Sequence, residues 1–310
     1  QPPVAVSAMD GYAVRAADVA SVPATLTVIG EAPAGGAFDG NVGAGQAVRI
    51  FTGGPVPTGA DAIVIQEDTM RDGDQVTVKE AVLAGRFIRP AGLDFSAGDV
   101  GVEAGRTLTA RDIALCAAMN VPWLRVRRRP RVAVLANGDE LVMPGDTIGP
   151  NQIVSSNNVG LCALIDASGG EAIDLGIAPD DADGLVAMAA GARGADLLIT
   201  IGGASVGDHD LIQSVLGESG LNVDFWRIAM RPGKPLIFGH FGDVPMLGLP
   251  GNPVSALVCG LVFLKPAIAA LLGADAPDLA TRSATITSDL GKNDQRQDYL
   301  RATTTKDDNG

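Results

Sequence analysis

Short apolar runs separated by turn residues fill the first hundred residues of the chain. The separators are clusters of Gly, Pro and Asp, such as Gly35-Gly36 and Asp72-Gly73-Asp74. Runs of this length between such clusters are typical of short strands in a small β domain. The pattern therefore predicts a β-rich domain with strands at residues 26–29, 47–51, 62–65 and 75–78.

The spacing of the apolar residues changes after Pro130. Segments with strand character now alternate with segments of helical spacing, which is the signature of βαβ units on a parallel sheet. The predicted strands lie at 132–136, 172–177, 196–201, 225–230, 235–241 and 244–249, and the predicted helices at 157–167, 182–192, 211–216 and 253–273. Strand character at 283–286 and 299–303 indicates the start of a further β domain.

A predicted helix at 111–120 and a basic run at 125–131 lie between the two patterned regions. Val126 and Pro130 interrupt the basic run, which we interpret as a solvated linker and not as a nucleic-acid patch. The expected organisation is a β-rich domain at 1–91, a linker or dimerisation segment at 92–129, an α/β domain at 130–273 and an incomplete C-terminal β domain at 274–310.

The amino-acid composition and net charge exclude several classes of protein. Apolar residues make up 46% of the 310 residues and charged residues 19%, as in globular proteins. The net charge of −13 argues against nucleic-acid binding, because phosphate contacts need a basic face. Two His and three Cys, without a C-x-x-C pair, favour neither a zinc site nor a disulfide framework.

Targeting and membrane-spanning segments leave recognisable patterns in a sequence. The chain begins at Gln1 without an initiator Met, and we expect residues to be missing before it; no signal peptide is visible. The apolar stretch 253–273 contains Lys265-Pro266, so we expect a buried core helix and no contact with a membrane. The expected location is cytoplasmic.

The segment from Thr200 to Asp210 has the sharpest chemical pattern. An apolar strand leads into Gly202-Gly203, followed by Ser205, Gly207 and two carboxylates at the expected start of a helix. Glycines at such a turn let the backbone approach a phosphate, and the helix start offers free N–H groups. The alternative is a tight turn with an Asp cap. A hydrolase is disfavoured, since only two His are present to serve the literal Gly-x-Ser-x-Gly match.

Three other segments fit an anionic, metal-bound ligand. Arg231 and Lys234 flank a Pro-Gly turn and suit an oxyanion, although a surface turn with two solvated bases would look the same. The segment 249–255 ends a strand and opens a helix, with Pro250, Gly251, Asn252 and Ser255; it is also a good helix start. Glu140 follows the first α/β strand, and with Asp210 it forms an expected Mg²⁺ site at one edge of the sheet.

Six segments, in this order, resemble the molybdopterin molybdenumtransferase family, which is MoeA in bacteria and the gephyrin E-domain in animals. The segments are Ser-Ala-Met-Asp-Gly-Tyr-Ala-Val at 7–14, Phe-Thr-Gly-Gly-Pro-Val-Pro-Thr-Gly-Ala-Asp-Ala at 51–62, Gly-Asp-Glu-Leu at 138–141, Gly-Gly-Ala-Ser-Val-Gly-Asp-His-Asp at 202–210, Pro-Gly-Lys-Pro at 232–235 and Leu-Pro-Gly-Asn-Pro-Val-Ser at 249–255. The six segments run from Ser7 to Ser255, and the resemblance as a whole extends to Arg301, which is nearly the whole chain.

This resemblance implies a multidomain α/β protein, with a three-layer molybdopterin-binding domain on a parallel or mixed sheet. It further implies a homodimeric enzyme of molybdenum cofactor biosynthesis. Such an enzyme binds adenylylated molybdopterin and molybdate, inserts the metal and releases AMP with the help of Mg²⁺. The C-terminal β domain of the family is then largely missing after Gly310.

The residues that match functional positions of the family are of two kinds. The implied catalytic acids are Asp10, Asp94, Glu140 and Asp210. The implied substrate-binding residues are Thr52, Gly202, Gly203, Ser205, Gly207, Arg231, Lys234, Pro250, Gly251, Asn252, Ser255 and Arg301. Two positions depart from the family: Arg231 replaces a frequent Lys, and Asn137 a Ser or Thr that contacts the pterin. The acid matching Asp10 acts across the family's dimer, in the site of the second subunit.

Two alternatives stay open on the sequence. A molybdopterin adenylyltransferase shares the glycine-turn sheet unit but is a single small domain, and it is also a possible partner of this chain. A non-catalytic scaffold is the second alternative, because the gephyrin relative also clusters receptors.

Overall fold

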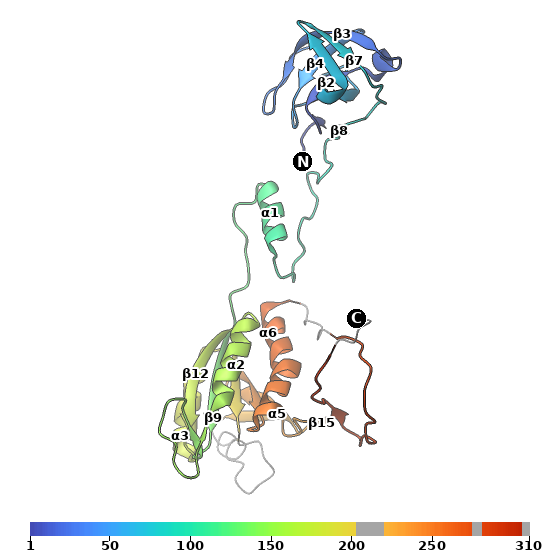
Figure 1. Cartoon of the computed structure of the whole chain (residues 1–310). Coiled ribbons are helices and arrows are strands. Elements are labelled where there is room, and N and C mark those ends of the chain that lie inside the picture. Colours follow the sequence, from blue (N-terminus) through green and yellow to red (C-terminus); the bar gives the residue numbers. More distant parts are fainter. Residues whose placement is uncertain (203–219, 275–280, 306–310) are drawn as a thin grey trace. The chain divides into compact units, whose positions relative to one another are not determined.

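The computed structural model describes residues 1–202, 220–274 and 281–305 (Figure 1). The chain forms two compact units. The first unit comprises Gln1–Glu103 and Leu108–Pro122, and the second comprises Ala104–Thr107 and Trp123–Gly310. Each unit has hydrophobic clusters of its own.

The first unit is built on a six-stranded sheet with the order β5-β2-β4-β3-β7-β6. All neighbours in this sheet are antiparallel except β3 and β4, which run parallel. Strands β1 and β8 form a separate antiparallel pair. The elements are β1 (Val6–Ser7), β2 (Gly11–Val14), η1 (Ala16–Val19), β3 (Ala24–Ala32), β4 (Gln46–Ile50), β5 (Ala62–Ile65), η2 (Gln66–Asp68), β6 (Thr69–Asp72), β7 (Gln75–Val78) and β8 (Ile88–Arg89).

Strands β2, β4 and β5 of this sheet are buried on both faces. Tyr12 and Val14 enter one cluster, whereas Ala13, between them in β2, enters the other. Successive side chains of a strand point to opposite faces, so covering both faces selects apolar residues at every position. The β-rich domain and its four predicted strands are therefore confirmed, with β3 longer than predicted.

Helix α1 (Ala110–Ala118) follows and matches the predicted helix within two residues. Thr109 and Asp112 form a capping box in which each side chain accepts a hydrogen bond from the backbone of the other. This satisfies two of the N–H groups that a helix start leaves free. Asn120, with φ of 60°, prevents the helix from extending further.

The second unit contains a mixed sheet of the order β12-β9-β13-β17-β16-β14 in its described part. The first four strands are parallel, and β16 and β14 are antiparallel to their neighbours. The elements are β9 (Arg131–Asn137), β10 (Leu141–Val142), β11 (Ile153–Val154), α2 (Ser156–Ala167), β12 (Glu171–Ala178), α3 (Ala182–Ala189), η3 (Ala190–Ala192), β13 (Leu197–Ile201), β14 (Leu221–Trp226), β15 (Met230–Arg231), β16 (Ile237–Phe241), β17 (Val244–Leu249), α5 (Pro253–Cys259), η4 (Gly260–Leu264), α6 (Lys265–Leu272) and β18 (Gln297–Asp298).

Helices cover both faces of this sheet (Figure 1). Leu161 of α2 and Ile268 of α6 join one cluster with Val132, Val134 and other sheet residues. Leu185 of α3 joins the other cluster, on the opposite face, with Leu135 and Leu198. The second unit therefore has the three layers that the resemblance implies.

One long apolar helix runs from Pro253 to Leu272 and is, among the described residues, the one helix long and apolar enough to span a membrane. Cys259, Leu264 and Ile268 lie in the core, which accounts for part of this apolar character. Lys265-Pro266 does not break the helix, because the π-helical turn η4 precedes Pro266. The wider turn changes the hydrogen-bond pattern where the proline N–H is missing.

Three predicted strands are wrong. Residues 225–230 do not form one strand, because Arg227 has φ of 72° and separates β14 from β15. Residues 283–286 and 299–303 are not strands either. Near them only Gln297 and Asp298 pair as a strand, with β15, and strand-forming residues without a neighbouring strand stay irregular. The predicted helix at 211–216 lies outside the described residues.

The basic run 125–131 is more than a solvated linker. Both terminal nitrogens of Arg128 donate to the Asp196 carboxylate at 2.7 Å. Arg129 donates to the carbonyl of Gly170. These contacts fix the linker to the segments that precede β13 and β12.

Asp196→Asn is expected to lower the free energy of unfolding by about 1 kcal/mol at neutral pH, because Arg128 is largely exposed. Hydrogen bonding to Arg128 lowers the pKa of Asp196. A lowered folded pKa stabilises the fold above the unfolded pKa of about 4, and this contribution is lost as the pH falls through the folded value. Denaturant titrations at several pH values should thus show that the free energy of unfolding of the variant depends less on pH in the acid range. Asp243→Asn, at an exposed turn, is the control and should keep the pH dependence of the wild-type chain.

Candidate active site

The carboxyl ends of three parallel strands meet at one edge of the second unit's sheet. Ile201 of β13 pairs with Ala136 of β9 and with Leu249 of β17. The next residues are therefore neighbours, and Gly202 N–H donates to the Leu249 carbonyl at 3.1 Å. Open α/β sheets bind ligands at this edge. We call the segments that follow β9, β13 and β17 the strand-end edge.

Gly202 and Gly251 approach each other at this edge. A Cβ on Gly251 would lie 3.6 Å from the Gly202 Cα. Gly202 has φ of +93°, and a Cβ there would lie 2.9 Å from the Asn137 carbonyl oxygen. The Gly251 carbonyl in turn accepts a hydrogen bond from Asn157 Nδ2 at 2.8 Å. Close backbone packing and a positive φ thus explain why residue 202 is glycine, whereas a Cβ at position 251 would make an ordinary contact.

Asn137 is held in one orientation by a residue that the sequence did not single out. Its Nδ2 donates to Asp180 Oδ1 at 2.7 Å, while Oδ1 is buried without a partner among the described residues. Asp180 follows β12, the parallel strand next to β9. An acid just after a predicted strand was the available signal, because neighbouring parallel strands end at the same edge.

Glu140 lies in the turn after β9 with an exposed side chain. Gly138 has φ of +143°, and a Cβ there would be 2.4 Å from Glu140 Oε2, so the carboxylate lies against the glycine. The adjacent Asp139 accepts a hydrogen bond from Asp180 N–H at 3.1 Å. Among the described residues, no cation pairs with Glu140, which leaves a hard oxygen ligand open at the strand-end edge.

Several predicted site residues lie outside the part of the chain that the structure describes. They are Gly203, Ser205, Gly207 and Asp210. The expected pairing of Glu140 with Asp210 therefore stays a prediction. The described residues contain no group of three or more His, Cys, Asp or Glu placed to hold a metal ion.

The two cations of the 231–234 loop differ in their surroundings. Arg231 Nη2 contacts Asp298 Oδ2 at 2.5 Å, whereas the exposed Lys234 makes no ion pair with any described residue. Gly233 between them has φ of +111°, and a Cβ there would lie 2.6 Å from Cys259 Sγ. The loop is thus packed on the core, and Lys234 is the less compensated charge.

Asn252 and Ser255 have a clear structural role at the start of α5. Asn252 Oδ1 accepts from Ser255 N–H at 3.2 Å, as an N-cap does, and Pro253 takes the first helical position. Pro250 is buried and Gly251 exposed. The capping alternative is confirmed for Asn252, while its predicted contact with substrate stays a prediction.

The first unit joins two of the sequence motifs. Asp10 Oδ1 accepts hydrogen bonds from both the backbone N–H and the hydroxyl of Thr52, each at 2.7 Å. The Thr52 backbone bond is the main cause that lowers the pKa of Asp10. Ser7 and Gly53 add a backbone hydrogen bond between the same segments. Asp10 is thus ionised near neutral pH and shares one local structure with Thr52.

Asp94 and Arg301 have no polar side-chain partner among the described residues. Both are exposed, and neither side chain makes a hydrogen bond or ion pair with a described residue. The Asp94 backbone N–H donates to the Gln1 carbonyl at 2.8 Å. Their roles remain those that the resemblance implies.

Gly202→Ala is expected to lower the free energy of unfolding by about 2–3 kcal/mol, because the new Cβ would add a backbone clash to an unfavourable φ. Denaturant unfolding would measure the loss. Gly194→Ala is the matched control, since Gly194 has φ of +78° with nothing within 4 Å of a Cβ. It should cost about 1 kcal/mol. Equal losses of stability in the two variants would show that the backbone near residue 202 moves and relieves the clash.

Two family descriptions match separate parts of the chain. Residues 1–120 match the MoeA N-terminal region (domain I and II), and residues 133–270 match the probable molybdopterin binding domain. The second match covers the sheet and the described part of the strand-end edge from Asn137 to Ser255.

Relatives and solved structures agree with these matches. A molybdopterin molybdenumtransferase of Nostoc sp. is 40% identical over 275 residues, which are 86% of this chain and 63% of the relative. The chain thus spans about two thirds of that relative's length. Molybdopterin molybdenumtransferase 2 of Mycobacterium tuberculosis is 37% identical over 306 residues, 96% of this chain and 76% of the relative.

A crystal structure of the molybdopterin biosynthesis MoeA protein from Pyrococcus horikosii superimposes with a TM-score of 0.76. It is 36% identical, over 88% of this chain and 69% of that chain. This likeness covers most of the chain, and the Mycobacterium tuberculosis relative is matched over more than two thirds of its length. The chain belongs to the molybdopterin molybdenumtransferase family.

Proposed function

We propose that this chain is the catalytic part of an enzyme of molybdenum cofactor biosynthesis, which inserts molybdate into adenylylated molybdopterin and releases AMP. The observation that carries the proposal is the strand-end edge, where Asn137, Gly202 and Gly251 meet in the domain matched to molybdopterin binding. Close-packed glycines at this edge let a phosphate-bearing ligand approach the backbone. The match of residues 1–120 favours this activity over a single-domain adenylyltransferase.

The charges of the 231–234 loop, which precedes β16 beside the end of β17, support the same proposal. Lys234, which makes no ion pair with any described residue, offers a cation for molybdate, and the guanidinium of Arg231 has further N–H groups. Asn137, fixed by Asp180, holds a buried acceptor that suits an N–H of the pterin. Each contact would orient the substrate rather than react with it.

Mg²⁺ fits the residues that are present. The exposed carboxylate of Glu140 is a hard oxygen ligand without a competing cation among the described residues, and Asp210 is the second proposed ligand. When bound, Mg²⁺ would neutralise charge on the phosphate that leaves as AMP. Glu140, held against Gly138, would place the ion at the strand-end edge.

Assembly and location are proposed on the resemblance. We infer a homodimer in which Asp10 serves the site of the partner subunit, and a cytoplasmic enzyme that receives its substrate from the adenylyltransferase. Closed two-fold pairs are the commonest protein oligomers. A low pKa suits Asp10 for such a role, because it arrives ionised.

The test is AMP release from adenylylated molybdopterin by the purified chain, measured with and without molybdate. Release that depends on both molybdate and Mg²⁺ supports the proposal. Pyrophosphate release from ATP and molybdopterin, without a need for molybdate, would identify an adenylyltransferase. No release by a folded chain that binds its partners would favour a scaffold.

Lys234→Ala is expected to raise the molybdate concentration needed for half-maximal AMP release about tenfold or more, with a smaller effect on pterin binding. The reason is that Lys234 is exposed and unpaired among the described residues of a loop packed on the core. Titrations with molybdate and with pterin would measure the two effects separately. Lys265→Ala, a half-buried lysine in α6, is the control for loss of one positive charge. Equal losses for both ligands would place Lys234 at the pterin phosphate.

A further inference from the structure

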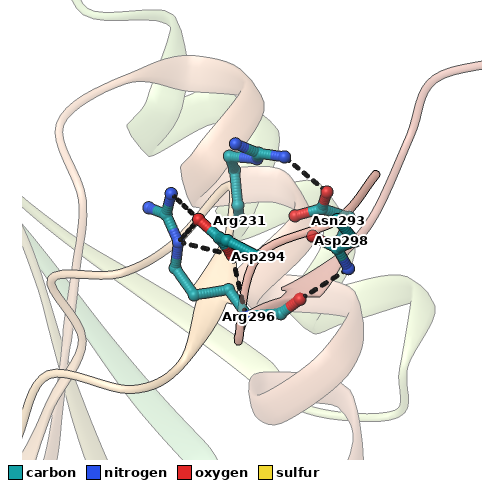
Figure 2. Close-up of polar contacts among 5 residues, drawn as sticks. All are labelled: Arg231, Asn293, Asp294, Arg296 and Asp298. Carbon is teal, nitrogen blue, oxygen red and sulfur yellow. Dashed lines mark hydrogen bonds and ion pairs between the residues drawn. The ribbon is translucent and has the colours of Figure 1, made fainter. Parts of the chain in front are cut away.

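The segment after α6 pairs with the loop that carries Arg231 (Figure 2). Strand β18 runs parallel to β15, with Asp298 opposite Arg231. Gln297 N–H donates to the Ala229 carbonyl and Tyr299 N–H to the Arg231 carbonyl, both at 2.8 Å. The backbone of Arg231 is thus hydrogen-bonded to this segment.

Asp298 also binds the side chain of Arg231. The 2.5 Å contact joins Asp298 Oδ2 to Nη2, at one end of the guanidinium. The Asp298 side chain is 13% exposed and the Arg231 side chain 52% exposed. A largely buried carboxylate therefore holds one end of a guanidinium whose Nε and Nη1 groups make no hydrogen bond with any described residue (Figure 2).

The position of Asp298 is itself well supported. Tyr299 packs against the core cluster that contains Met230, next to Arg231. On the other side of Asp298, Arg296 donates from its backbone and its side chain to Asp294. These contacts lower the pKa of Asp294 to about 2, so this pair stays charged over the working pH range. Asp298 therefore lies between a residue packed on the core and a turn closed by Asp294 and Arg296.

We propose that Asp298 is a positioning residue, which orders the Arg231 guanidinium so that its remaining N–H groups bind the oxyanion substrate. The proposal rests on the proposed function of the strand-end edge. A long Arg side chain loses conformational freedom when it binds, and a partner that orders it in advance reduces that loss. The planar guanidinium has five donors, so one carboxylate at Nη2 leaves a second edge for another oxyanion.

The experiment measures the affinity of the purified chain for molybdate alone, by isothermal titration calorimetry. Asp298→Ala is expected to weaken binding about fivefold, and Asp298→Glu to restore part of it. Arg231→Ala should also weaken binding, and adding Asp298→Ala to it should cause no further loss. Asp294→Asn is the matched control, since it removes an acid of the same segment that makes no hydrogen bond or ion pair with Arg231. Its affinity should change much less than that of Asp298→Ala, because Asp294 acts on Arg231 only through a weaker electrostatic interaction, and all variants should be folded at the temperature of the titration.

Several results would overturn the inference. Unchanged or tighter molybdate binding by Asp298→Ala, while Arg231→Ala weakens it, would show that Asp298 only neutralises Arg231. A further loss in the Arg231→Ala background would show that Asp298 acts by another route. These outcomes leave the proposed function standing. A wild-type chain that binds molybdate no better than the Lys234→Ala and Arg231→Ala variants would instead overturn the proposed anion site, and the inference with it.

Discussion

Glu140→Gln is expected to lower Mg²⁺-dependent AMP release about 100-fold, with the free energy of unfolding changed by less than about 0.5 kcal/mol. The glutamine keeps the shape of the side chain but removes the negative charge that binds Mg²⁺. The small effect on stability follows from exposure, since no described cation pairs with the Glu140 carboxylate. Single-turnover AMP release over a range of Mg²⁺ concentrations would measure the loss.

The neighbouring acid supplies the control for this prediction. Asp139 carries the same charge one residue earlier, but its carboxylate accepts the Asp180 N–H. Asp139→Asn should therefore retain most of the Mg²⁺ dependence and lose some stability. Asp210→Asn should behave like Glu140→Gln if the two acids share the ion. Normal Mg²⁺ stimulation in Glu140→Gln would exclude this carboxylate as a ligand.

Mixing Asp10→Asn and Glu140→Gln subunits is expected to restore about a quarter of the wild-type activity, although each variant alone is inactive. In a shared-site dimer, each mixed pair regains one intact site out of two, and random exchange makes about half of the dimers mixed. Asp10→Asn is preferred to Asp10→Ala because the amide oxygen can still accept from the Thr52 N–H and hydroxyl. The loss then reports the charge and not the local fold.

Subunit exchange has to be proven independently, for example by mass spectrometry of differently labelled chains. Glu67→Gln, which changes an exposed acid of the first unit, is the control partner. A mixture of Glu67→Gln with Glu140→Gln subunits should be no more active than the Glu67→Gln subunits that it contains. If the Asp10 mixture stays inactive after proven exchange, Asp10 does not act in the partner's site.

Periodicity in the sequence was sufficient to identify most strands and helices. Runs such as 62–65 and 244–249 coincide with β5 and β17, because burial of the strand requires apolar residues along it. The same reasoning failed at 225–230, where Arg227 has a left-handed backbone that apolar spacing does not reveal. It also failed at 283–286, since strand character alone does not provide a partner strand.

The strand-end edge was predictable for a related reason. Parallel strands joined by helices end at one edge, so Asn137, Gly202 and Pro250 had to lie near each other once the strands were assigned. Glycine at 202 could also be interpreted before the fold was known, because a glycine turn after a strand allows a close approach to the backbone.

The choice of side-chain partners depended on the tertiary structure. Asp10 meets Thr52 across 42 residues, Asn137 meets Asp180 across 43, and Arg231 meets Asp298 across 67. The sequence established that acids and cations of these types are present, and local pattern established the strands that carry them. A hydrogen bond needs two atoms about 3 Å apart, and only the path of the folded backbone decides which distant residues come that close.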